Sequence, residues 1–494
     1  MIVPSGDLAR TLSHDQVVSL LGAQPEGLAP AGPFVGVGQD DRRIEGDLFV
    51  AVRGRRHDPL GQIGALAAGG VRGLVGEAER PGDWPYAYYR VPSARRALSL
   101  LEQAFRGNPA RHLRVIGVTG TNGKSTTVRL LAGILRAAGR RAGWANTVTT
   151  ATPRHEFPSC MTTPEPRELA RILAQQVADG AEDVVLEVSS HSLAQERVAG
   201  LEFAGAVFTN LSRDHYDYHG TEAAYLEAKL RLFRQLTEGA PAVIPAGGPV
   251  ARDAAELVGR AVLSFGDHAP ADAYALEIRP EPQRTVARLS VLGDELEVIT
   301  PLVGRHNMRN VLASVLLARA LGVASSDVAR GVAETPPVRG RLERVPTPRG
   351  QVYVDYAHTP DALESVLQSL RERVGGRLLV VFGCGGDRDR GKRPVMGRVA
   401  EELADLVFVT SDNPRSEDPR AVIDDVLAGM RRSTSVRVDV DRRVAIAAAL
   451  DALQESDVLV VAGKGHETSQ EIAGRQYPFD DRQVVEEIIA KGER

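Results

Sequence analysis

The sequence predicts an α/β protein of about three domains, and three observations support this prediction. The chain has 494 residues, whereas a typical domain takes about 150. Short apolar runs recur in its second and third parts, each followed by turn residues and a helical pattern, as in parallel sheets covered by helices. One such run, residues 113–118, leads through a glycine-rich loop into a helix predicted over residues 126–138.

The first 108 residues predict a small α/β unit. Residues 34–37 and 47–52 have the composition of short strands, and they alternate with stretches rich in alanine and glycine such as residues 64–70. Glycine and proline within residues 106–109 are typical of a linker. We therefore expect a first domain over residues 1–108.

Residues 109–336 predict a second domain. Apolar runs at residues 183–188 and 206–210 follow the first run and are separated by helix-like stretches. Across residues 271–301 the pattern changes to alternation of apolar and polar residues, which predicts an antiparallel flap.

Residues 337–494 predict a third domain, after a joint at residues 336–340 that contains two prolines and a glycine. Four apolar runs in it are each followed by turn residues and a helical pattern, so we expect a second doubly wound α/β domain. These runs are residues 352–355, 378–382, 406–410 and 458–462.

Composition excludes several classes of protein. Hydrophobic residues make up 43% and charged residues 25%, and the net charge of −4 gives no reason to expect DNA or RNA as a partner. No apolar run approaches the roughly 20 residues that span a bilayer, and residues 1–7 lack the pattern of a signal peptide. The two cysteines, Cys160 and Cys384, provide neither a disulfide framework nor a zinc cluster. A cytoplasmic enzyme is the expectation.

Lysine is rare in this chain. Only five of the sixty basic residues are lysine, and four of the five lie in short motifs, namely Lys124, Lys229, Lys392 and Lys464. A GC-rich coding background is one interpretation of the arginine bias itself. Lysine is a compact point charge whose amine can react, whereas arginine is a rigid, permanently charged fork. The motif lysines therefore indicate where chemistry takes place.

Residues 119–125 have the context of a phosphate-binding loop, between a strand and a helix. Their small side chains let backbone N–H groups converge on phosphate oxygens, Lys124 reaches the β- and γ-phosphates, and Ser125 or Thr126 can hold Mg²⁺. The spacing departs by one position from GxxxxGK[ST], because Val118 stands where the first glycine is expected. A glycine-rich turn with a surface lysine is the alternative.

Two more polar groups follow predicted strands. Glu187 ends the run at residues 183–188, and His215 lies in the segment that leaves the next strand. Strand ends in such sheets line one crevice, so these side chains could complete a metal site. A strand-end ion pair for Glu187 and a structural role for His215 are the alternatives.

Together these motifs resemble the Mur ligase family over nearly the whole chain. The matching segments occur in the expected order: GVTGTNGKST at 117–126, Thr162–Pro164, EVSSHSL at 187–193, NLSRDHYDYHG at 210–220, Ala228–Lys229, GRHNMRN at 304–310, GRLERV at 340–345, VDYAHTPDAL at 354–363 and DNPR at 412–415. The resemblance implies three domains: a UDP-binding domain at 1–108, a central ATP-binding domain with a P-loop at 109–336, and a C-terminal Rossmann-like domain for the incoming amino acid at 337–494.

The resemblance also implies the reaction. ATP, with Mg²⁺, would phosphorylate the terminal D-glutamate carboxylate of UDP-MurNAc-L-Ala-D-Glu, and an amine would then attack the acyl phosphate, as one step of peptidoglycan synthesis. A carboxylate is a poor electrophile until it carries a leaving group, and Mg²⁺ neutralises charge on the transferred phosphoryl group.

Residue roles carry over from the family position by position. Lys229 matches a lysine that CO₂ carbamylates, forming an anion (N6-carboxylysine) that helps to hold a second Mg²⁺; an ordinary helix-surface lysine is the alternative. The first metal would be held by Ser125 or Thr126, Glu187 and His215. Lys124, Lys229, Glu187 and His215 are then the catalytic candidates. The ATP-side positions are Gly120, Thr121, Asn122, Gly123, Lys124, Ser125, Thr126, Asn307, Asn310, Arg341 and Asp355.

Two segments match positions for the nucleotide-sugar substrate. Asp40, Asp41 and Arg42 resemble the uridine segment of the family, although Asp41 replaces the usual serine. The positions that hold the muramoyl-dipeptide are Thr162, Thr163, Ser189, Gln195 and Arg197. Hydroxyl, amide and guanidinium groups suit a ligand with phosphates, amides and a carboxylate.

The incoming amino acid should be selected by a set of residues in the third domain: Asp412, Asn413, Pro414 and Arg415, with Arg388, Gly463 and Glu467. Meso-diaminopimelate is favoured, because Arg415 offers a fork for its distal carboxylate, Glu467 can take the distal ammonium, and Arg388 can hold the other carboxylate. L-Lysine and L-ornithine would leave Arg415 unpaired. In the alternative, Arg415 only pairs with Glu417 or Asp418.

Other functions stay open at this point. A folylpolyglutamate synthase shares the central and C-terminal domains, and a P-loop NTPase switch or scaffold would only bind nucleotide. A kinase would keep the phosphate on its product. We expect a monomer with UDP-MurNAc-dipeptide and a diamino acid as its small-molecule partners, and no membrane partner.

Overall fold

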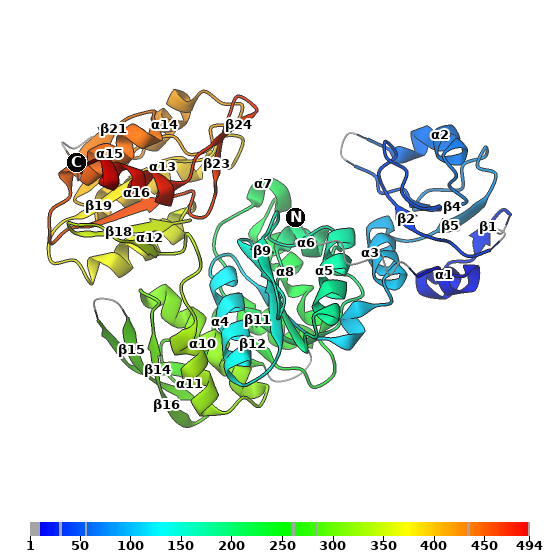
Figure 1. Ribbon diagram of the computed structural model, residues 1–494, viewed down its shortest axis with the longest axis horizontal. Helices are drawn as coiled ribbons and strands as arrows, with labels where there is room; N and C mark the ends of the chain where they lie inside the picture. Colours follow the sequence, from blue (N-terminus) through cyan, green and yellow to red (C-terminus); the bar gives the residue numbers. More distant parts are fainter. Residues whose placement is uncertain are drawn as a thin grey trace. The chain divides into compact units, whose positions relative to one another are not determined.

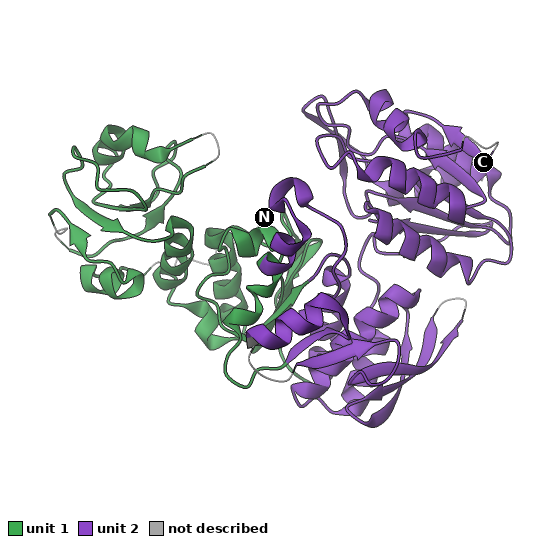
Figure 2. Ribbon diagram, turned by 180° about the vertical axis from the view of Figure 1, so that it is seen from behind, with its two compact units in different colours: residues 1–119, 139–206, 228–241 green, residues 120–138, 207–227, 242–494 purple. Residues whose placement is uncertain are grey.

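The computed structural model describes residues 10–28, 32–54, 57–258, 262–281, 284–431 and 435–492. Residues 1–7, where no signal peptide was expected, lie outside this part. The chain forms two compact units (Figure 2): one has residues 1–119, 139–206 and 228–241, and the other has residues 120–138, 207–227 and 242–494. This division crosses the three expected domains, whose boundaries remain a prediction.

The N-terminal part contains a five-stranded sheet in the order β1-β5-β4-β3-β2 (Figure 1). Only β1 is antiparallel to its neighbour. The elements are α1 His14–Leu21, β1 Pro25–Glu26, β2 Val37–Gly38, β3 Leu48–Val50, η1 Pro59–Gln62, α2 Ile63–Ala68, β4 Gly73–Gly76, β5 Ala87–Arg90 and α3 Ala94–Phe105. Apolar side chains such as Phe34, Val50 and Leu101 form its buried core.

The expected strands at 34–37 and 47–52 are shorter in the structure. Asp47 explains the difference, because its carboxylate accepts a hydrogen bond from Val35 N at 2.8 Å and forms an ion pair with Arg72. The Val35 N–H group therefore donates to the Asp47 side chain and not to a neighbouring strand, so β2 begins only at Val37.

A charged cluster connects α3 with the elements beside it. The Arg167 guanidinium donates to Glu102 Oε1 at 2.9 Å and also contacts Glu45 and the Val37 carbonyl. Arg106 pairs with the other oxygen of Glu102. Burial raises the pKa of Glu102 to about 7, and the Arg106 guanidinium offsets part of that effect.

The titration of Glu102 should make stability depend on pH. Its folded-state pKa lies above the unfolded value, so the native state binds more protons and the free energy of unfolding falls as pH rises toward 7. Relative to Glu102→Gln, the wild type should lose about 1–2 kcal/mol between about pH 5 and pH 7.5. Urea unfolding at several pH values measures this. The exposed Glu156 provides the control variant Glu156→Gln, and parallel curves for wild type and Glu102→Gln would contradict the prediction.

In the first unit, a parallel sheet places the end of β10 beside the end of β6. Strand β10 (Asp183–Glu187) lies between β6 (Arg114–Thr119) and β7 (Ala142–Ala145), and Glu187 is in register with Val118. Strands β8 (Thr149–Ala151) and β9 (Glu156–Pro158) continue it in antiparallel pairs. The associated helices are η2 Pro109–His112, α5 Pro166–Ala178, α6 Ser190–Ala194 and η3 Phe233–Gln235.

In the second unit, helix α4 (Lys124–Ala137) packs against α10 (Arg305–Ala320) and α11 (Ser325–Glu334). The expected antiparallel flap is confirmed, because β14 (Ala273–Pro280), β15 (Thr285–Val291) and β16 (Asp294–Thr300) pair in antiparallel fashion. The smaller elements are α7 Tyr216–His219, α9 Gly248–Val258, β12 Ala242–Pro245 and β13 Leu263–Gly266; strand β11 (Phe203–Phe208) and helix α8 (Glu222–Leu230) each have residues in both units.

The C-terminal part contains a six-stranded sheet in the order β17-β18-β22-β19-β20-β21 (Figure 1). All four expected strands are present, and every neighbour pair except β17–β18 is parallel. The elements are β17 Glu343–Val345, β18 Gln351–Asp355, α12 Pro360–Arg371, β19 Leu378–Phe382, α13 Lys392–Leu403, β20 Leu406–Val409, α14 Pro419–Leu427, β21 Val436–Val438, α15 Arg442–Ala452, β22 Val458–Ala462, β23 Ser469–Ile472, β24 Arg475–Pro478 and α16 Asp481–Gly492.

Apolar residues fill both faces of this sheet, which explains the continuous apolar runs of its strands. The carboxyl ends of β18, β19, β20 and β22 carry the polar motifs singled out above. Among the described residues, no helix combines the length and the apolar character needed to cross a bilayer.

Candidate active site

The glycine-rich loop connects β6 to α4 and allows no side chain at two positions. Gly120 and Gly123 have φ angles of 140° and 82°, in a region that favours glycine. A Cβ atom on Gly120 would collide with Thr209 Oγ1, and one on Gly123 would collide with the Asn310 amide. The loop backbone is therefore tightly enclosed by Thr209 and Asn310.

Asn210 and Thr209 hold the loop in shape. Thr121 N donates to Asn210 O at 2.9 Å and Asn122 N donates to Asn210 Oδ1 at 3.0 Å. Thr209 Oγ1 and Asn210 Nδ2 donate back to Asn122 O at 2.6 and 2.9 Å. Lys124 Nζ donates to Thr121 O at 2.7 Å, so its ammonium lies over the loop. No motif in the sequence indicated this role of Thr209.

The predicted ATP-side asparagines lie on the first turns of α10 and are buried. Asn307 Nδ2 donates to Val303 O at 2.8 Å, and Asn310 Nδ2 donates to Asn307 Oδ1 at 3.2 Å. The structure thus brings Asn310 against Gly123, beside the phosphate loop.

Glu187 is buried at the end of β10 and has a fixed orientation. Thr147 N donates to Glu187 Oε2 and Thr147 Oγ1 donates to Oε1, both at 2.9 Å. Each carboxylate oxygen can accept more than one bond, so this geometry is compatible with a metal ligand. No sequence pattern pointed to Thr147 as the residue that orients this carboxylate.

The other predicted ligands of the first metal are Ser125, Thr126 and His215. Ser125 and Thr126 are buried on the first turn of α4. His215 has a φ angle of 55°, and its ring lies 3.2 Å from Asp214 Oδ2. Within the described ranges, no three His, Cys, Asp or Glu side chains form a ready-made metal cluster. An Mg²⁺ site built on hydroxyl groups and a single carboxylate is compatible with that finding.

Lys229 is on α8 and its side chain is buried, with 1% of the residue exposed. The alternative of a helix-surface lysine is therefore wrong. A buried ammonium is costly unless an anion pairs with it or its charge is removed. Carbamylation removes the cation, so burial is compatible with the modified form.

The positions matched to the dipeptide lie together. Thr163 Oγ1 donates to Glu187 O at 2.8 Å and accepts from Ser189 N at 3.0 Å. Arg197 donates to Thr163 O at 3.0 Å and to Gln195 Oε1 at 2.7 Å. Thr162 lies beside them, since its hydroxyl is 3.2 Å from Thr147 Oγ1. Glu165, which sequence reasoning did not identify, pairs with Arg197 at 2.7 Å.

In the segment matched to uridine, the acidic side chains have partners within the chain. Asp41, which stands where the family has serine, lies 2.6 Å from His57 Nε2. Asp40 accepts from Arg42 Nε at 2.9 Å, and this contact holds the pKa of Asp40 below its usual range. The replacement at Asp41 thus changes the local charge pattern.

Asp355 and Arg341 lie near the start of the C-terminal part and contact its backbone and side chains. Asp355 is buried and accepts from Leu342 N at 2.6 Å and Ala357 N at 2.7 Å. Burial raises its pKa, and the Arg341 guanidinium and these two N–H groups counteract the rise. The Arg341 guanidinium stacks 4.4 Å from the centre of the Tyr356 ring.

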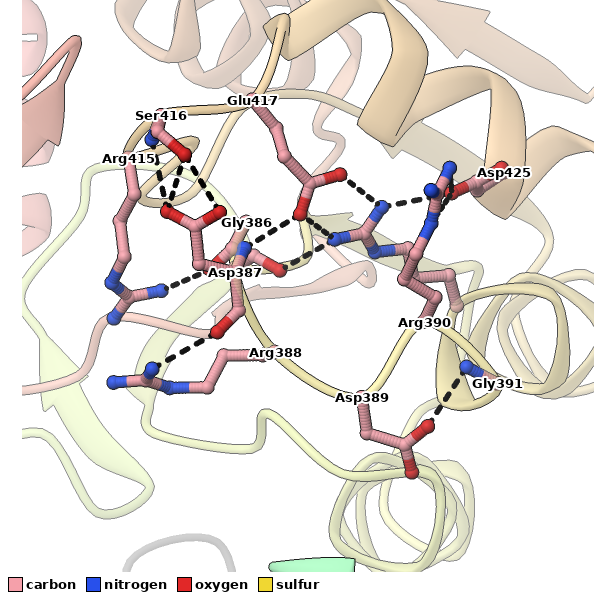
Figure 3. A network of polar contacts seen from close by, with 12 residues as sticks. Gly386, Asp387, Arg388, Asp389, Arg390, Gly391, Arg415, Ser416, Glu417 and Asp425 are labelled. Atoms are coloured by element: carbon pink, nitrogen blue, oxygen red, sulfur yellow. Dashed lines mark hydrogen bonds and ion pairs between the residues drawn. The ribbon is translucent and has the colours of Figure 1, made fainter. Parts of the chain in front are cut away.

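Arg415 and Arg388 lie on adjacent loops of the C-terminal part (Figure 3). Arg415 has a φ angle of 53°, and its Nη1 donates to Gly386 O at 2.8 Å. Both arginine side chains border Gly385, where a Cβ atom would lie 2.8 Å from Arg415 Nη1 and 3.8 Å from Arg388 Cγ. The positive φ angle of Arg415 is uncommon for a non-glycine residue, and such conformations are often found at functional sites.

The alternative in which Arg415 pairs with Glu417 or Asp418 is wrong. Glu417 accepts from Arg393, with distances of 2.7 and 2.9 Å. Asp418 caps α14 by accepting from Arg420 N at 3.0 Å. The acidic partner of Arg415 is Glu471, at 3.6 Å.

A network of ion pairs and hydrogen bonds stabilises the loops that carry Arg388 and Arg415. The sequence analysis did not predict this network. Arg393 is fully buried and bridges Glu417 and Asp425. Asp387 accepts from the Ser416 hydroxyl at 2.8 Å (Figure 3). The Arg393 contact holds the pKa of Glu417 at about 2. The loops after β19 and β20 are thereby fixed to each other.

The remaining predicted residues complete this group. Asp412 lies against Gly463, because a Cβ atom on Gly463 would be 2.5 Å from Asp412 Oδ2. Asn413 Nδ2 donates to Glu467 Oε2 at 2.8 Å. The structure thus brings Arg388, the 412–415 loop, Gly463 and Glu467 to one edge of the sheet.

Comparisons with known proteins find the family that the sequence motifs resemble. The family described as Mur ligase middle domain matches residues 118–318, and the family described as Mur ligase, glutamate ligase domain matches residues 340–465. A Chlorobaculum tepidum protein named UDP-N-acetylmuramoyl-L-alanyl-D-glutamate–2,6-diaminopimelate ligase is 42% identical over 494 residues, covering 97% of this chain and 97% of that protein.

Solved structures show the same similarity. A structure of a UDP-N-acetylmuramoyl-L-alanyl-D-glutamate–2,6-diaminopimelate ligase has a TM-score of 0.69 and 32% identity, and covers 98% of this chain and 100% of that chain. A Mycobacterium tuberculosis folylpolyglutamate synthase structure has a TM-score of 0.63 at 20% identity, and covers 74% of this chain and 92% of that chain. The latter similarity concerns the fold alone.

Proposed function

The chain belongs to the Mur ligase family, and on that premise we propose that it joins meso-diaminopimelate to the D-glutamate carboxylate of UDP-MurNAc-L-Ala-D-Glu with ATP. The grouping of Arg388, Arg415 and Glu467 at one sheet edge is the observation that carries the choice of amino acid. Two guanidinium groups and one carboxylate suit a ligand that has two carboxylates and a distal ammonium.

Activation of the carboxylate takes place at the phosphate loop. Gly120 and Gly123 let the loop pack tightly against Thr209 and Asn310. Its backbone N–H groups would bind the triphosphate, and Lys124 supplies a positive charge. The terminal phosphoryl group of ATP passes to an oxygen of the D-glutamate carboxylate, which becomes an acyl phosphate, and ADP is the leaving group. The free amine of the amino acid then attacks the acyl carbon, and phosphate and the proton of the amine leave as the amide forms.

We propose the metal-binding groups of this scheme from the family resemblance. Ser125 or Thr126, Glu187 and His215 would hold Mg²⁺, and Lys229 would contribute as a carbamate. When bound, Mg²⁺ neutralises charge on the transferred phosphate. Thr147 keeps the Glu187 carboxylate in a single orientation by its two hydrogen bonds.

Thr163, Ser189, Gln195 and Arg197 would hold the muramoyl-dipeptide, and the hydrogen bonds among these four residues support this proposal. The uridine would lie near Asp40, Asp41 and Arg42. We further propose a monomeric enzyme in the cytoplasm, where its nucleotide substrates are found.

Phosphate release with UDP-MurNAc-L-Ala-D-Glu and ATP tests the proposal, with diaminopimelate, lysine and ornithine supplied separately. Phosphate release that requires diaminopimelate supports it. Turnover with lysine or ornithine but not diaminopimelate would exclude the proposed role of Arg415. Absence of turnover with any of them, together with activity on a folate substrate, would favour a folylpolyglutamate synthase.

Arg415→Ala should raise the KM for diaminopimelate at least about tenfold, because one hydrogen bond to a charged group contributes roughly 1.5–3 kcal/mol. The KM values for ATP and the dipeptide substrate should stay within about twofold, since the contacts of Arg415 are with Gly386 and Glu471 in the C-terminal part. Steady-state kinetics with each substrate varied in turn measures this. The exposed Arg420 provides the control variant Arg420→Ala; an unchanged KM in Arg415→Ala would place amino-acid selection elsewhere.

A further inference from the structure

Lys464 is a fully buried lysine at the centre of the amino-acid loops. Its Nζ lies 2.6 Å from Ser469 O, 2.9 Å from Glu467 Oε2 and 3.3 Å from Asn413 Oδ1. None of its side chain is exposed. The ammonium therefore cannot contact a substrate directly, and its three donors are used within the protein.

Glu467 is held by one of its two oxygens. Oε2 accepts from Lys464 Nζ at 2.9 Å and from Asn413 Nδ2 at 2.8 Å. Among the described residues, no hydrogen bond reaches Oε1, and 30% of the side chain is exposed. The carboxylate is thus oriented with one oxygen anchored and the other available.

Asn413 extends the same arrangement to the loop after β20. Its Oδ1 accepts from Glu471 N at 2.9 Å as well as from Lys464. The amide plane is fixed from both sides, which directs Nδ2 to Glu467. Lys464 therefore contacts both the loop that carries Arg415, through Asn413, and the Glu467 carboxylate.

We infer that Lys464 is a positioning residue for amino-acid selection: it anchors Glu467 Oε2 and Asn413 so that Glu467 Oε1 faces the distal ammonium of the substrate. This inference rests on the proposed function, because it concerns the same amino-acid site. Lys464 acts through Glu467 and does not touch the reacting atoms.

The site also explains why a lysine occurs here in a chain whose basic residues are mostly arginine. Three oxygens surround one buried point, which a tetrahedral ammonium satisfies, whereas a planar guanidinium needs more volume and a different donor geometry. The Lys464 charge offsets the Glu467 charge, so the pair is neutral overall. Selection of the amino acid at Glu467 Oε1 then depends on a hydrogen-bond donor of the substrate in the correct position and not on charge alone.

The test replaces Lys464 by methionine, which has a similar length and no charge. Lys464→Met should raise the KM for diaminopimelate at least about tenfold, while the KM values for ATP and the dipeptide substrate change less than about twofold. The exposed Lys491 on α16 provides the matched control Lys491→Met, which should behave as the wild type. A general loss of kcat with all three KM values unchanged would overturn the inference.

A double mutant separates positioning from simple structural support. Because Lys464 acts through Glu467, Lys464→Met added to Glu467→Gln should cause almost no further rise in KM. If the two effects multiply, Lys464 acts independently of Glu467 and the inference is wrong. Should Lys464→Met fail to fold by circular dichroism, Asn413→Ala, which removes the other anchor of Oε2, is measured instead and should show the same selective rise in KM and the same lack of additivity with Glu467→Gln.

The wild-type substrate profile keeps this inference distinguishable from the proposed function. If the wild type uses lysine in place of diaminopimelate, the proposed function fails, and the variants are then measured with lysine. A selective KM effect on lysine would still support positioning by Lys464, because both amino acids carry a distal ammonium. No effect on either amino acid would overturn it.

Discussion

Lys229→Ala is expected to lower the rate of phosphate release at least about 100-fold, comparable to removing a charged group at a transition state. Lys229 is 1% exposed, so its amine does not serve to keep the protein surface soluble. If it is carbamylated, the variant loses an anion that helps to hold Mg²⁺, and added bicarbonate cannot restore it.

Lys229→Arg is the decisive companion variant. Arginine keeps the positive charge but has no amine that reacts with CO₂ under these conditions, so it should be as inactive as the alanine variant. Phosphate release at saturating substrates measures both variants, with Lys491→Ala as the control. Near-wild-type rates in Lys229→Ala would exclude a role for the carbamate, and activity in Lys229→Arg would show that a cation suffices.

Arg393→Met is expected to lower the free energy of unfolding by about 2–3 kcal/mol. Its guanidinium is fully buried and bridges Glu417 and Asp425, which are themselves partly exposed. Removing it leaves two neighbouring carboxylates without their common cation. Because their partial exposure screens this cost, the effect should be smaller than for a fully buried pair.

The pH dependence of this effect has a defined sign. The pKa of Glu417 is lowered to about 2, first by its hydrogen bond to Arg393. A lowered folded-state pKa contributes stability above the unfolded value, and that contribution is lost as pH falls toward 2. The difference between wild type and Arg393→Met should therefore be largest near neutral pH and shrink below about pH 4.

Urea unfolding at several pH values measures the difference, and the chain offers a matched control. Arg390 also pairs with Asp425, at 3.0 Å, but 66% of its side chain is exposed. Arg390→Met should cost less than about 1 kcal/mol. If both variants cost the same, burial of Arg393 adds nothing to the support of these loops.

The fold of the central and C-terminal parts follows closely from local sequence patterns. The four apolar runs of the third part became parallel strands, because burial on both faces of a sheet requires continuous apolar residues. The first part was predicted less well. Asp47 binds the backbone at Val35 through its side chain, and such a contact between distant residues leaves no periodic signal.

The candidate site shows the same contrast. The loop with Lys124 and the ends of β10 and β20 were predictable, since each is a short contiguous motif. The residues that orient them were not: Thr147 contacts Glu187 across 40 residues of sequence, and Arg393 contacts Glu417 across 24. Burial of Lys229 could not be predicted either, because its helix has mixed polarity around its circumference.

The loop that carries Arg415 is tied to the β23–β24 hairpin by backbone bonds. Arg415 N donates to Glu471 O at 3.0 Å, and Ala473 N donates to Arg415 O at 2.7 Å. Transplanting residues 412–415 alone into a relative with a different amino-acid preference would therefore move the side chains without their scaffold. An exchange of amino-acid specificity between relatives therefore requires residues 412–415 and residues 469–478 to be replaced together, because the two segments form one structural unit.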